Sequence, residues 1–286
     1  MSFPDKPKVI TATLLLFLAL AFLLLKQVKE VKPEAQVAIP TLTPTASPSA
    51  TPTPKPLTFG QMNALYGPCV SLPVLMYHHI QDGETAAQNG NAYLTVSPET
   101  FEKQLAYLND KGYASIGPAE LISFFNQGQS LPKKPIMLTF DDGYSDFATV
   151  AAPLLTRYSI KATVFVPTGL LENPGYLSWS NITSLAQSGF YFGNHTWSHQ
   201  NLGTTLEKIK KEVDTAQVQL TDHGQDPLKV FAYPYGTISQ RAANYLRESG
   251  YQLALTTTPG RILCTKQRLS LPRIRIGNTA LSFYGL

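Results

Sequence analysis

Two short polar stretches carry the side chains in this sequence whose types and spacing suit hydrolytic chemistry. Asp141 and Asp142 follow an apolar run at residues 136–140, and His195 and His199 follow later in the chain. Histidines four residues apart can present their rings on one side of a helical turn or a tight loop, and neutral imidazole is the commonest metal ligand. One carboxylate with two histidines is a three-ligand set, which leaves a metal position open for water or substrate, as in catalytic zinc sites.

The two adjacent aspartates suit two different roles. Successive side chains of a strand point in alternate directions, so one carboxylate enters a pocket while the other turns toward a neighbour. An Asp-Asp-Gly sequence alone is typical of a solvated turn. The buried run before it and the spaced histidines after it favour a metal-dependent hydrolase.

The elements that must position these residues follow an alternating pattern. Short apolar runs alternate with amphipathic segments, which is typical of a βα architecture. About seven or eight such units predict an α/β barrel, and in such a barrel the residues after the strand ends form the active site. The predicted strands are residues 74–77, 114–116, 136–140, 162–166, 190–193, 229–233, 253–256 and 273–276, and the clearest predicted helices are residues 98–110, 205–222 and 239–249.

Three motifs in this order resemble the polysaccharide deacetylases, also called the NodB-type or carbohydrate esterase family four domain. They are residues 139–143, the pair His195 and His199, and residues 231–236. The resemblance implies a distorted (β/α)7-8 barrel that binds one divalent metal ion through Asp142, His195 and His199. It also implies that Asp141 is the catalytic base. We expect zinc, and cobalt, nickel or iron(II) suit the same ligands.

The third motif and the C-terminal region depart from the family pattern. The resemblance implies that the Tyr235 backbone N–H binds the oxyanion, but Ala232 occupies the position where many members have an arginine that pairs with the catalytic aspartate. No histidine follows His223, so the usual C-terminal general acid is missing. His78 is the candidate replacement, as in the subgroup of poly-N-acetylglucosamine deacetylases with an N-terminal Tyr-His motif. We expect it to act as an imidazolium near neutral pH, and we assign His79 and His223 to structure or solvent.

The expected function is hydrolysis of N-acetyl groups on an N-acetylglucosamine-containing polysaccharide of the cell envelope or matrix. An O-acetyl carbohydrate esterase is an alternative, because the same site serves esters. A catalytically silent glycan-binding module is another, because the arginine is absent at position 232. A glycosidase is disfavoured, because adjacent residues rarely hold two carboxyl groups about 5 to 9 Å apart across a sugar. The identity of the polysaccharide stays open.

The N-terminal region predicts attachment to a membrane. After a short flank at residues 1–8, an apolar run at residues 9–25 predicts a transmembrane signal anchor, with a cleaved signal peptide as the rival. Residues 26–66 predict a juxtamembrane segment and a Pro/Thr/Ser-rich linker, and residues 67–286 predict the deacetylase domain. We expect a single-pass protein of the cell membrane, with its catalytic domain extracytoplasmic.

The remaining composition leaves several assignments open. Cys69 and Cys264 form either a disulfide between the two ends of the domain or two buried thiols.

A net charge of +4, without a dense basic run, gives nucleic-acid binding little support. We expect a monomer. Trp179 and Trp197 are either sugar-stacking or core residues, and Asn194 either orients a metal ligand or forms a turn.

Overall fold

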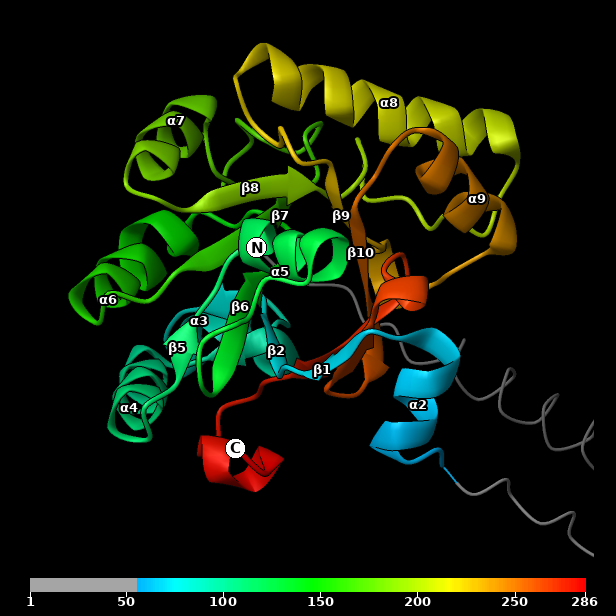
Figure 1. The fold of residues 1–286 in the computed structure, drawn as a ribbon. Coiled ribbons are helices and arrows are strands. Elements are labelled where there is room, and N and C mark those ends of the chain that lie inside the picture. The colour runs from blue at the N-terminus through cyan, green and yellow to red at the C-terminus, as the bar shows by residue number, and fades with distance from the viewer. Residues whose placement is uncertain (1–55) are drawn as a thin grey trace, which may run out of the picture. The chain divides into compact units, whose positions relative to one another are not determined.

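A computed structural model describes residues 56–286 of the protein (Figure 1). The strands are β1 (Cys69–Ser71), β2 (Val74–Tyr77), β3 (His79–Ile80), β4 (Thr95–Val96), β5 (Ala114–Ser115), β6 (Pro135–Phe140), β7 (Ala162–Val166), β8 (Tyr191–Asn194), β9 (Val230–Ala232), β10 (Leu253–Pro259), β11 (Ile262–Cys264) and β12 (Leu271–Arg275). The helices are α2 (Phe59–Tyr66), α3 (Gly83–Gln88), α4 (Pro98–Asp110), α5 (Pro118–Gln127), α6 (Ala152–Arg157), α7 (Trp179–Gln187), α8 (Leu206–Asp222) and α9 (Gln240–Glu248).

Seven parallel strands form a closed barrel. They pair in the order β2-β12-β10-β9-β8-β7-β6, and β6 pairs with β2 to complete the ring. The short strand β5 pairs with the first residues of β6, Pro135 and Ile136, and β2 pairs with β6 from Met137 onward. The predicted (β/α) barrel is therefore confirmed with seven strands, and all their carboxyl ends meet at one rim.

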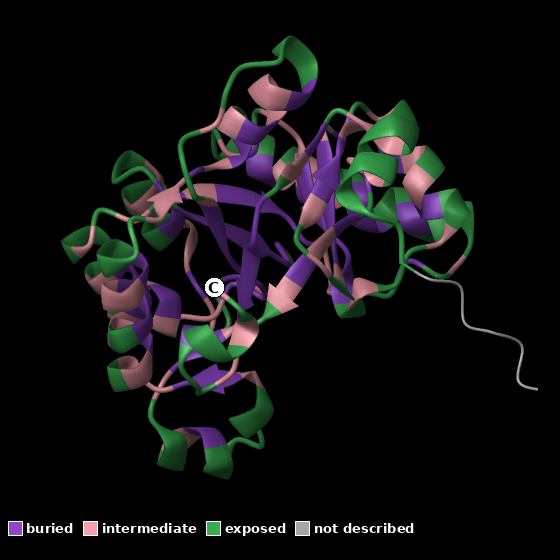
Figure 2. Ribbon diagram, turned by 60° about the horizontal axis from the view of Figure 1, so that its bottom comes forward, coloured by how far each residue is buried: buried purple, intermediate pink, exposed green. Residues whose placement is uncertain are grey.

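Alternation along the strands separates the barrel interior from the layer under the helices. Met137 of β6 packs with Phe165 of β7 and Leu253 of β10, whereas Leu138 and Val164 pack in the outer cluster. Figure 2 shows the buried residues concentrated on the strands, with the exposed ones on the outer faces of the helices. A residue two positions beyond an inward-facing residue also faces inward. This alternation therefore determines which side chains near the carboxyl ends of the strands point into the barrel.

Capping residues and apolar stripes determine the helices. The Ser97 side chain accepts a hydrogen bond from the Thr100 backbone N–H, and Pro98 occupies the first turn of α4, where its missing N–H costs nothing. Phe101, Leu105 and Leu108 are buried on one face of this helix. Thr205 caps α8 in the same way. Both helices agree with the sequence prediction to within one residue.

The folded region begins before the predicted boundary at residue 67. Helix α2 lies within the predicted linker and contacts β1 and β11. The predicted anchor at residues 9–25 and the rest of the linker up to residue 55 lie outside the described residues. Among residues 56–286, no helix has the length and apolar character needed to cross a membrane.

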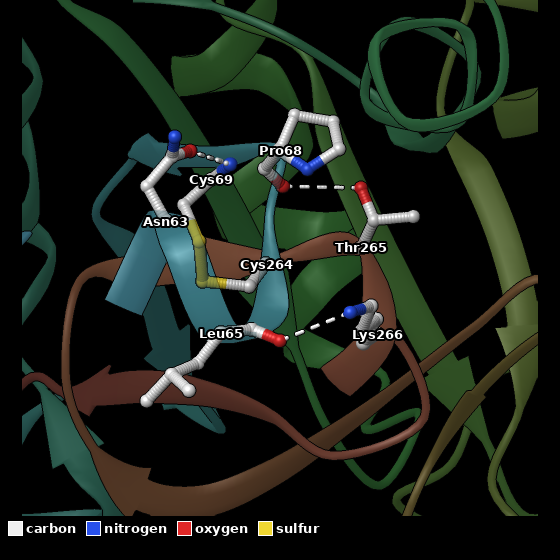
Figure 3. Close-up of a disulfide and its surroundings, with 7 residues drawn as sticks. All are labelled: Asn63, Leu65, Pro68, Cys69, Cys264, Thr265 and Lys266. Atoms are coloured by element: carbon white, nitrogen blue, oxygen red, sulfur yellow. Dashed lines mark hydrogen bonds between the residues drawn. A yellow bond between two sulfur atoms is a disulfide. The ribbon is translucent and has the colours of Figure 1, made fainter. Parts of the chain in front are cut away.

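A disulfide joins the segment before the first barrel strand to the segment between the last two barrel strands. Cys69 of β1 is bonded to Cys264 of β11, and these two strands pair antiparallel with the cysteines in register (Figure 3). The Cys69 backbone N–H donates to the Asn63 side chain (2.8 Å), and the Lys266 ammonium donates to the Leu65 carbonyl (3.1 Å). The disulfide alternative is thus confirmed over the buried free thiols, and it lies where α2 packs.

Candidate active site

Asp141 and Arg273 form a buried ion pair at the top of the barrel interior. Asp141, the first residue after β6, faces the barrel interior, as Met137 and Thr139 do. Arg273 of β12 also faces the interior. The guanidinium donates to both carboxylate oxygens, at 2.7 and 2.6 Å, and also to the Thr256 carbonyl and the Thr139 hydroxyl. Bidentate pairs of this kind fix the carboxylate in orientation as well as in charge.

This pair determines the charge of Asp141. Burial alone would raise its pKa, but the charge and hydrogen bonds of Arg273 outweigh burial and hold the pKa below its usual range. Asp141 is therefore ionised at neutral pH, as a proton acceptor must be. Arg273 of β12 is thus the cationic partner of Asp141, a role that Ala232 of β9 cannot fill.

Asp142, His195 and His199 converge beside Asp141. Asp142 Oδ1 lies 3.3 Å from His195 Nε2 and 3.1 Å from His199 Nε2, and the three residues meet the spacing of a metal site. His199 and Asp142 have left-handed backbone conformations (φ 58° and 74°). The two histidines thus lie on a tight loop after β8, one of the two geometries expected from their spacing, and strained backbone of this kind is common at functional sites.

The surroundings of the loop fix one histidine tautomer. His195 Nδ1 lies 2.7 Å from the Ala232 carbonyl oxygen, so Nδ1 carries the proton and Nε2 faces Asp142. The Asn194 side chain accepts from the Thr196 N–H (2.8 Å), which is its turn role. The Glu212 carboxylate accepts from the Ser198 N–H and hydroxyl, at 2.8 and 2.7 Å. Two imidazole nitrogens and one carboxylate oxygen, oriented in this way, fit a divalent metal ion.

His78 and His79 face different surroundings, as expected for adjacent residues of an extended segment. His78 has the inward parity of Val74 and lines the same cavity as Asp141. His79 is buried outside the cavity, where Nδ1 contacts Asp146 (2.5 Å) and Nε2 contacts the Asn91 side chain (3.1 Å). His79 is therefore a structural residue.

The charge of His78 differs from expectation. Burial, which is the largest influence, lowers its pKa to about 4. Asp141 and Asp142 act in the opposite sense but do not restore the ordinary value. His78 is therefore neutral at pH 7 in the protein without substrate, and the expected imidazolium is wrong for this state because the ring has lost most of its hydration.

Two exposed tyrosines stand at the mouth of the site. The cavity has a volume of about 330 Å³ and is lined by His78, the two aspartates, both loop histidines, Arg275 and several tyrosines. Tyr235 is 67 % exposed, adopts φ 59°, and packs edge-on against His199. Tyr93, between α3 and β4, is 76 % exposed. The structure thus brings all six predicted site residues to one cavity.

The other aromatic candidates lie elsewhere. Trp179 stacks on His223, with ring centroids 3.8 Å apart, and is partly buried against the outer core cluster. Trp197 lines a different cavity, next to Lys211 of α8. Neither tryptophan lines the active-site cavity.

Comparisons with known proteins agree with this geometry. A family model described as polysaccharide deacetylase matches residues 128–254. The deacetylase PplD from Streptococcus pyogenes, whose structure is solved in complex with acetate, is 32% identical, with a TM-score of 0.66, and the similarity covers 72% of this chain and 92% of that one. The chain belongs to the polysaccharide deacetylase family.

Two further relatives extend the comparison for this deacetylase. A polysaccharide deacetylase from Bacillus cereus is 29% identical, with a TM-score of 0.67, over 76% of this chain and 68% of that one. The poly-β-1,6-N-acetyl-D-glucosamine N-deacetylase of Escherichia coli is 25% identical, and the similarity covers 71% of this chain but 36% of that protein. The chain is accordingly a deacetylase, a hydrolase of a metal-dependent family.

Sequence reasoning missed Arg273. Its partner Asp141 lies 132 residues earlier in the chain, and no local pattern pairs them. A signal was present nevertheless, because Arg273 alternates with apolar residues in a buried strand. An arginine at an inward position of such a strand needs a carboxylate partner.

Proposed function

We propose that this deacetylase removes N-acetyl groups from a poly-N-acetylglucosamine type of polysaccharide in the cell envelope or matrix. The observation that carries the proposal is the convergence of an arginine-paired Asp141 with the Asp142–His195–His199 set in one open cavity. The name of the Escherichia coli relative supports β-1,6-linked N-acetylglucosamine as the first polymer to test.

The residues divide the reaction as follows. When bound at Asp142, His195 and His199, a divalent ion supplies positive charge that polarises the acetyl carbonyl and acidifies water. Asp141 accepts the proton of the attacking water, because Arg273 keeps it ionised. The Tyr235 backbone N–H donates to the carbonyl oxygen as negative charge develops there, a contribution of roughly 3 kcal/mol for one such donor.

His78 completes the proposed reaction at the leaving nitrogen. When the C–N bond breaks, this nitrogen must gain a proton, and His78 lines the cavity that contains Asp141. Since His78 starts neutral, it first takes up a proton, and the proton that Asp141 receives from water is the local source. The negative charge that develops on the acetyl oxygen favours the protonated ring.

Arg273 also bears on the alternative of a silent glycan-binding module. That alternative rests on the missing arginine at Ala232, and the pair between Arg273 and Asp141 replaces the missing contact. An O-acetyl esterase remains the chemical competitor. Because an alkoxide needs less protonation than an amine on departure, His78→Ala should slow amide hydrolysis more than ester hydrolysis.

The proposal extends to the metal and to the location of the protein. We propose zinc, because two imidazoles and one carboxylate form a catalytic zinc ligand set. We also propose an extracytoplasmic, membrane-anchored monomer. The Cys69–Cys264 disulfide supports an oxidising compartment, and the apolar run at residues 9–25 supports the anchor.

The test is acetate release by the full-length protein from β-1,6- and β-1,4-linked N-acetylglucosamine oligomers. We expect release that chelation abolishes and zinc restores, with a preference for the β-1,6 linkage. Cobalt, nickel and iron(II) are added back in parallel to compare the metals. Asp141→Asn should slow release by a factor of about 10² or more, whereas Asp222→Asn, which changes an exposed aspartate at the end of α8, should not. No release from the folded, zinc-loaded protein would refute the proposal.

A further inference from the structure

Arg275 is the last residue of β12, and it lies on the side of the strand that faces the barrel interior. Leu271 belongs to the interior cluster and Arg273 reaches Asp141, so Arg275 is the third residue of the same parity. It pairs in register with Met76 of β2, two residues before His78. Its side chain lines the active-site cavity.

The two arginines of β12 differ completely in their partners. Arg273 is 1% exposed and uses its donors on Asp141, Thr139 and Thr256. Arg275 is exposed, and within residues 56–286 no carboxylate lies at ion-pair distance from its guanidinium. The guanidinium of Arg275 is therefore available to a ligand that enters the cavity.

The rest of the cavity does not neutralise Arg275. Its two carboxylates are already committed, Asp141 to Arg273 and Asp142 to the two loop histidines. The charge of Arg275 also acts on His78, where it lowers the pKa. The positive charge of Arg275 therefore has no ion-pair partner in the cavity, which the exposed ring of Tyr93 also lines.

We propose that Arg275 is a specificity residue that binds a carboxylate or phosphate group wherever the sugar chain carries one beside the acetamido group being hydrolysed. This inference rests on the proposed function. A guanidinium matches either anion with two parallel hydrogen bonds. The same charge disfavours a neighbouring glucosamine, whose ammonium it repels, so an acidic or fully acetylated stretch is hydrolysed before a partly deacetylated one.

The experiment compares oligomers of equal length that differ only in the sugar next to the reactive N-acetylglucosamine. The neighbour is neutral N-acetylglucosamine, cationic glucosamine, anionic glucuronic acid or a sugar phosphate, and the full-length, metal-loaded protein is used throughout. We expect kcat/KM to rise about tenfold from the cationic to the neutral neighbour and again to an anionic one. The glucuronic acid and phosphate arms show which anion is preferred.

Variants at position 275 then test whether the guanidinium causes this order. Arg275→Ala should bring the ratio of anionic to neutral kcat/KM close to one, Arg275→Lys should retain part of it, and Arg275→Glu should reverse it in favour of glucosamine. Arg157→Ala removes the same charge from an exposed residue at the end of α6, and it should leave the ratio unchanged. High salt should reduce the ratio in the unaltered protein, since exposed charges are screened.

Two results would overturn the inference and leave the proposed function standing: turnover of the neutral oligomer without any preference, or a preference that persists in Arg275→Ala and Arg275→Glu. Failure to hydrolyse any oligomer would instead refute the proposed function, and the inference with it.

Discussion

Each end of the barrel buries an aspartate, and the two differ in charge: Asp141 is ionised at neutral pH, whereas Asp226 is mostly protonated. Asp141, at the rim, is 3% exposed and carries its charge beside Arg273. Asp226, before β9 at the other end, is 1% exposed and has only the Tyr191 hydroxyl and the Val230 N–H on one oxygen. Burial raises the pKa of Asp226 to about 8.

The difference shows that burial does not decide charge by itself. Desolvation raises the pKa of both groups, and a bidentate arginine reverses the outcome only at the rim. An ionised base is needed for hydrolysis, whereas a neutral carboxyl suffices to tie down a loop. Acid should therefore remove the stabilising contribution of Asp141, and alkali should remove that of Asp226.

The largest expected effect comes from neutralising Asp141. Asp141→Asn removes the proton acceptor, so kcat should fall roughly 10²- to 10⁴-fold. Because the Arg273 charge is left buried without its partner, the free energy of unfolding should also fall by about 3 to 5 kcal/mol. Acetate release per folded molecule and urea denaturation measure the two losses. Full activity in the folded variant would remove Asp141 from the reaction.

Removing the arginine should damage the same pair from its other side. Arg273→Met leaves Asp141 buried without a cation, which should cost about 3 to 5 kcal/mol of unfolding free energy. It should also raise the pKa of Asp141, so the acidic limb of the pH–activity profile should move to higher pH. In a double-mutant cycle, Asp141→Asn with Arg273→Met should lose less stability than the two single losses added together. Strict additivity would contradict the coupling.

The same type of substitution at the other end of the barrel should have the opposite sign. The folded-state pKa of Asp226, about 8, lies above its unfolded value, so its contribution to stability is complete below about pH 4 and is lost as pH rises through 8. Asp226→Asn removes this loss. Between pH 5 and 8 the unfolding free energy of the variant should gain about 3 to 4 kcal/mol relative to the unaltered protein.

Urea denaturation of both proteins across this pH range measures the difference, and acetate release should be unaffected. Parallel stability curves would mean that Asp226 is not protonated in the folded protein.

The smallest expected effect is at the hydroxyl that contacts Asp226. Tyr191→Phe removes a donor to Asp226 and an acceptor for the Leu228 N–H. The loss should be about 1 to 3 kcal/mol, because a buried acceptor loses a partner. The pKa of Asp226 should rise further, since the Tyr191 hydrogen bond lowers it. Combining Tyr191→Phe with Asp226→Asn should cost less than Tyr191→Phe alone in alkaline buffer.

Much of the fold was predictable because its strongest signals are local. Strands β2 and β7 and helix α4 coincide with their predicted ranges, since each is a short apolar run or a capped amphipathic segment. The convergence of Asp141 with the two loop histidines followed from a general rule, because the ends of parallel strands share one rim.

The remaining features depend on contacts between distant parts of the chain. The pair between Asp141 and Arg273 links the end of β6 to β12, on the two sides of β2, and sequence spacing does not show that these two strands flank the same strand. The charge state of His78 depends on how closely the barrel encloses it. The linker prediction also missed α2, whose Thr58 capping box is a local signal but whose helix has no buried residue.

The Cys69–Cys264 disulfide makes residues 69–264 a covalent ring. A protease that cuts the backbone once, in any loop within that ring, produces two pieces that stay linked through sulfur. His78, Asp141, Asp142 and both loop histidines all lie on the ring, so a single cut leaves the cavity residues attached to one another. Under reducing conditions the same cut separates the chain into two fragments, and a shift in gel mobility on adding reductant would report where the first exposed loop is cleaved.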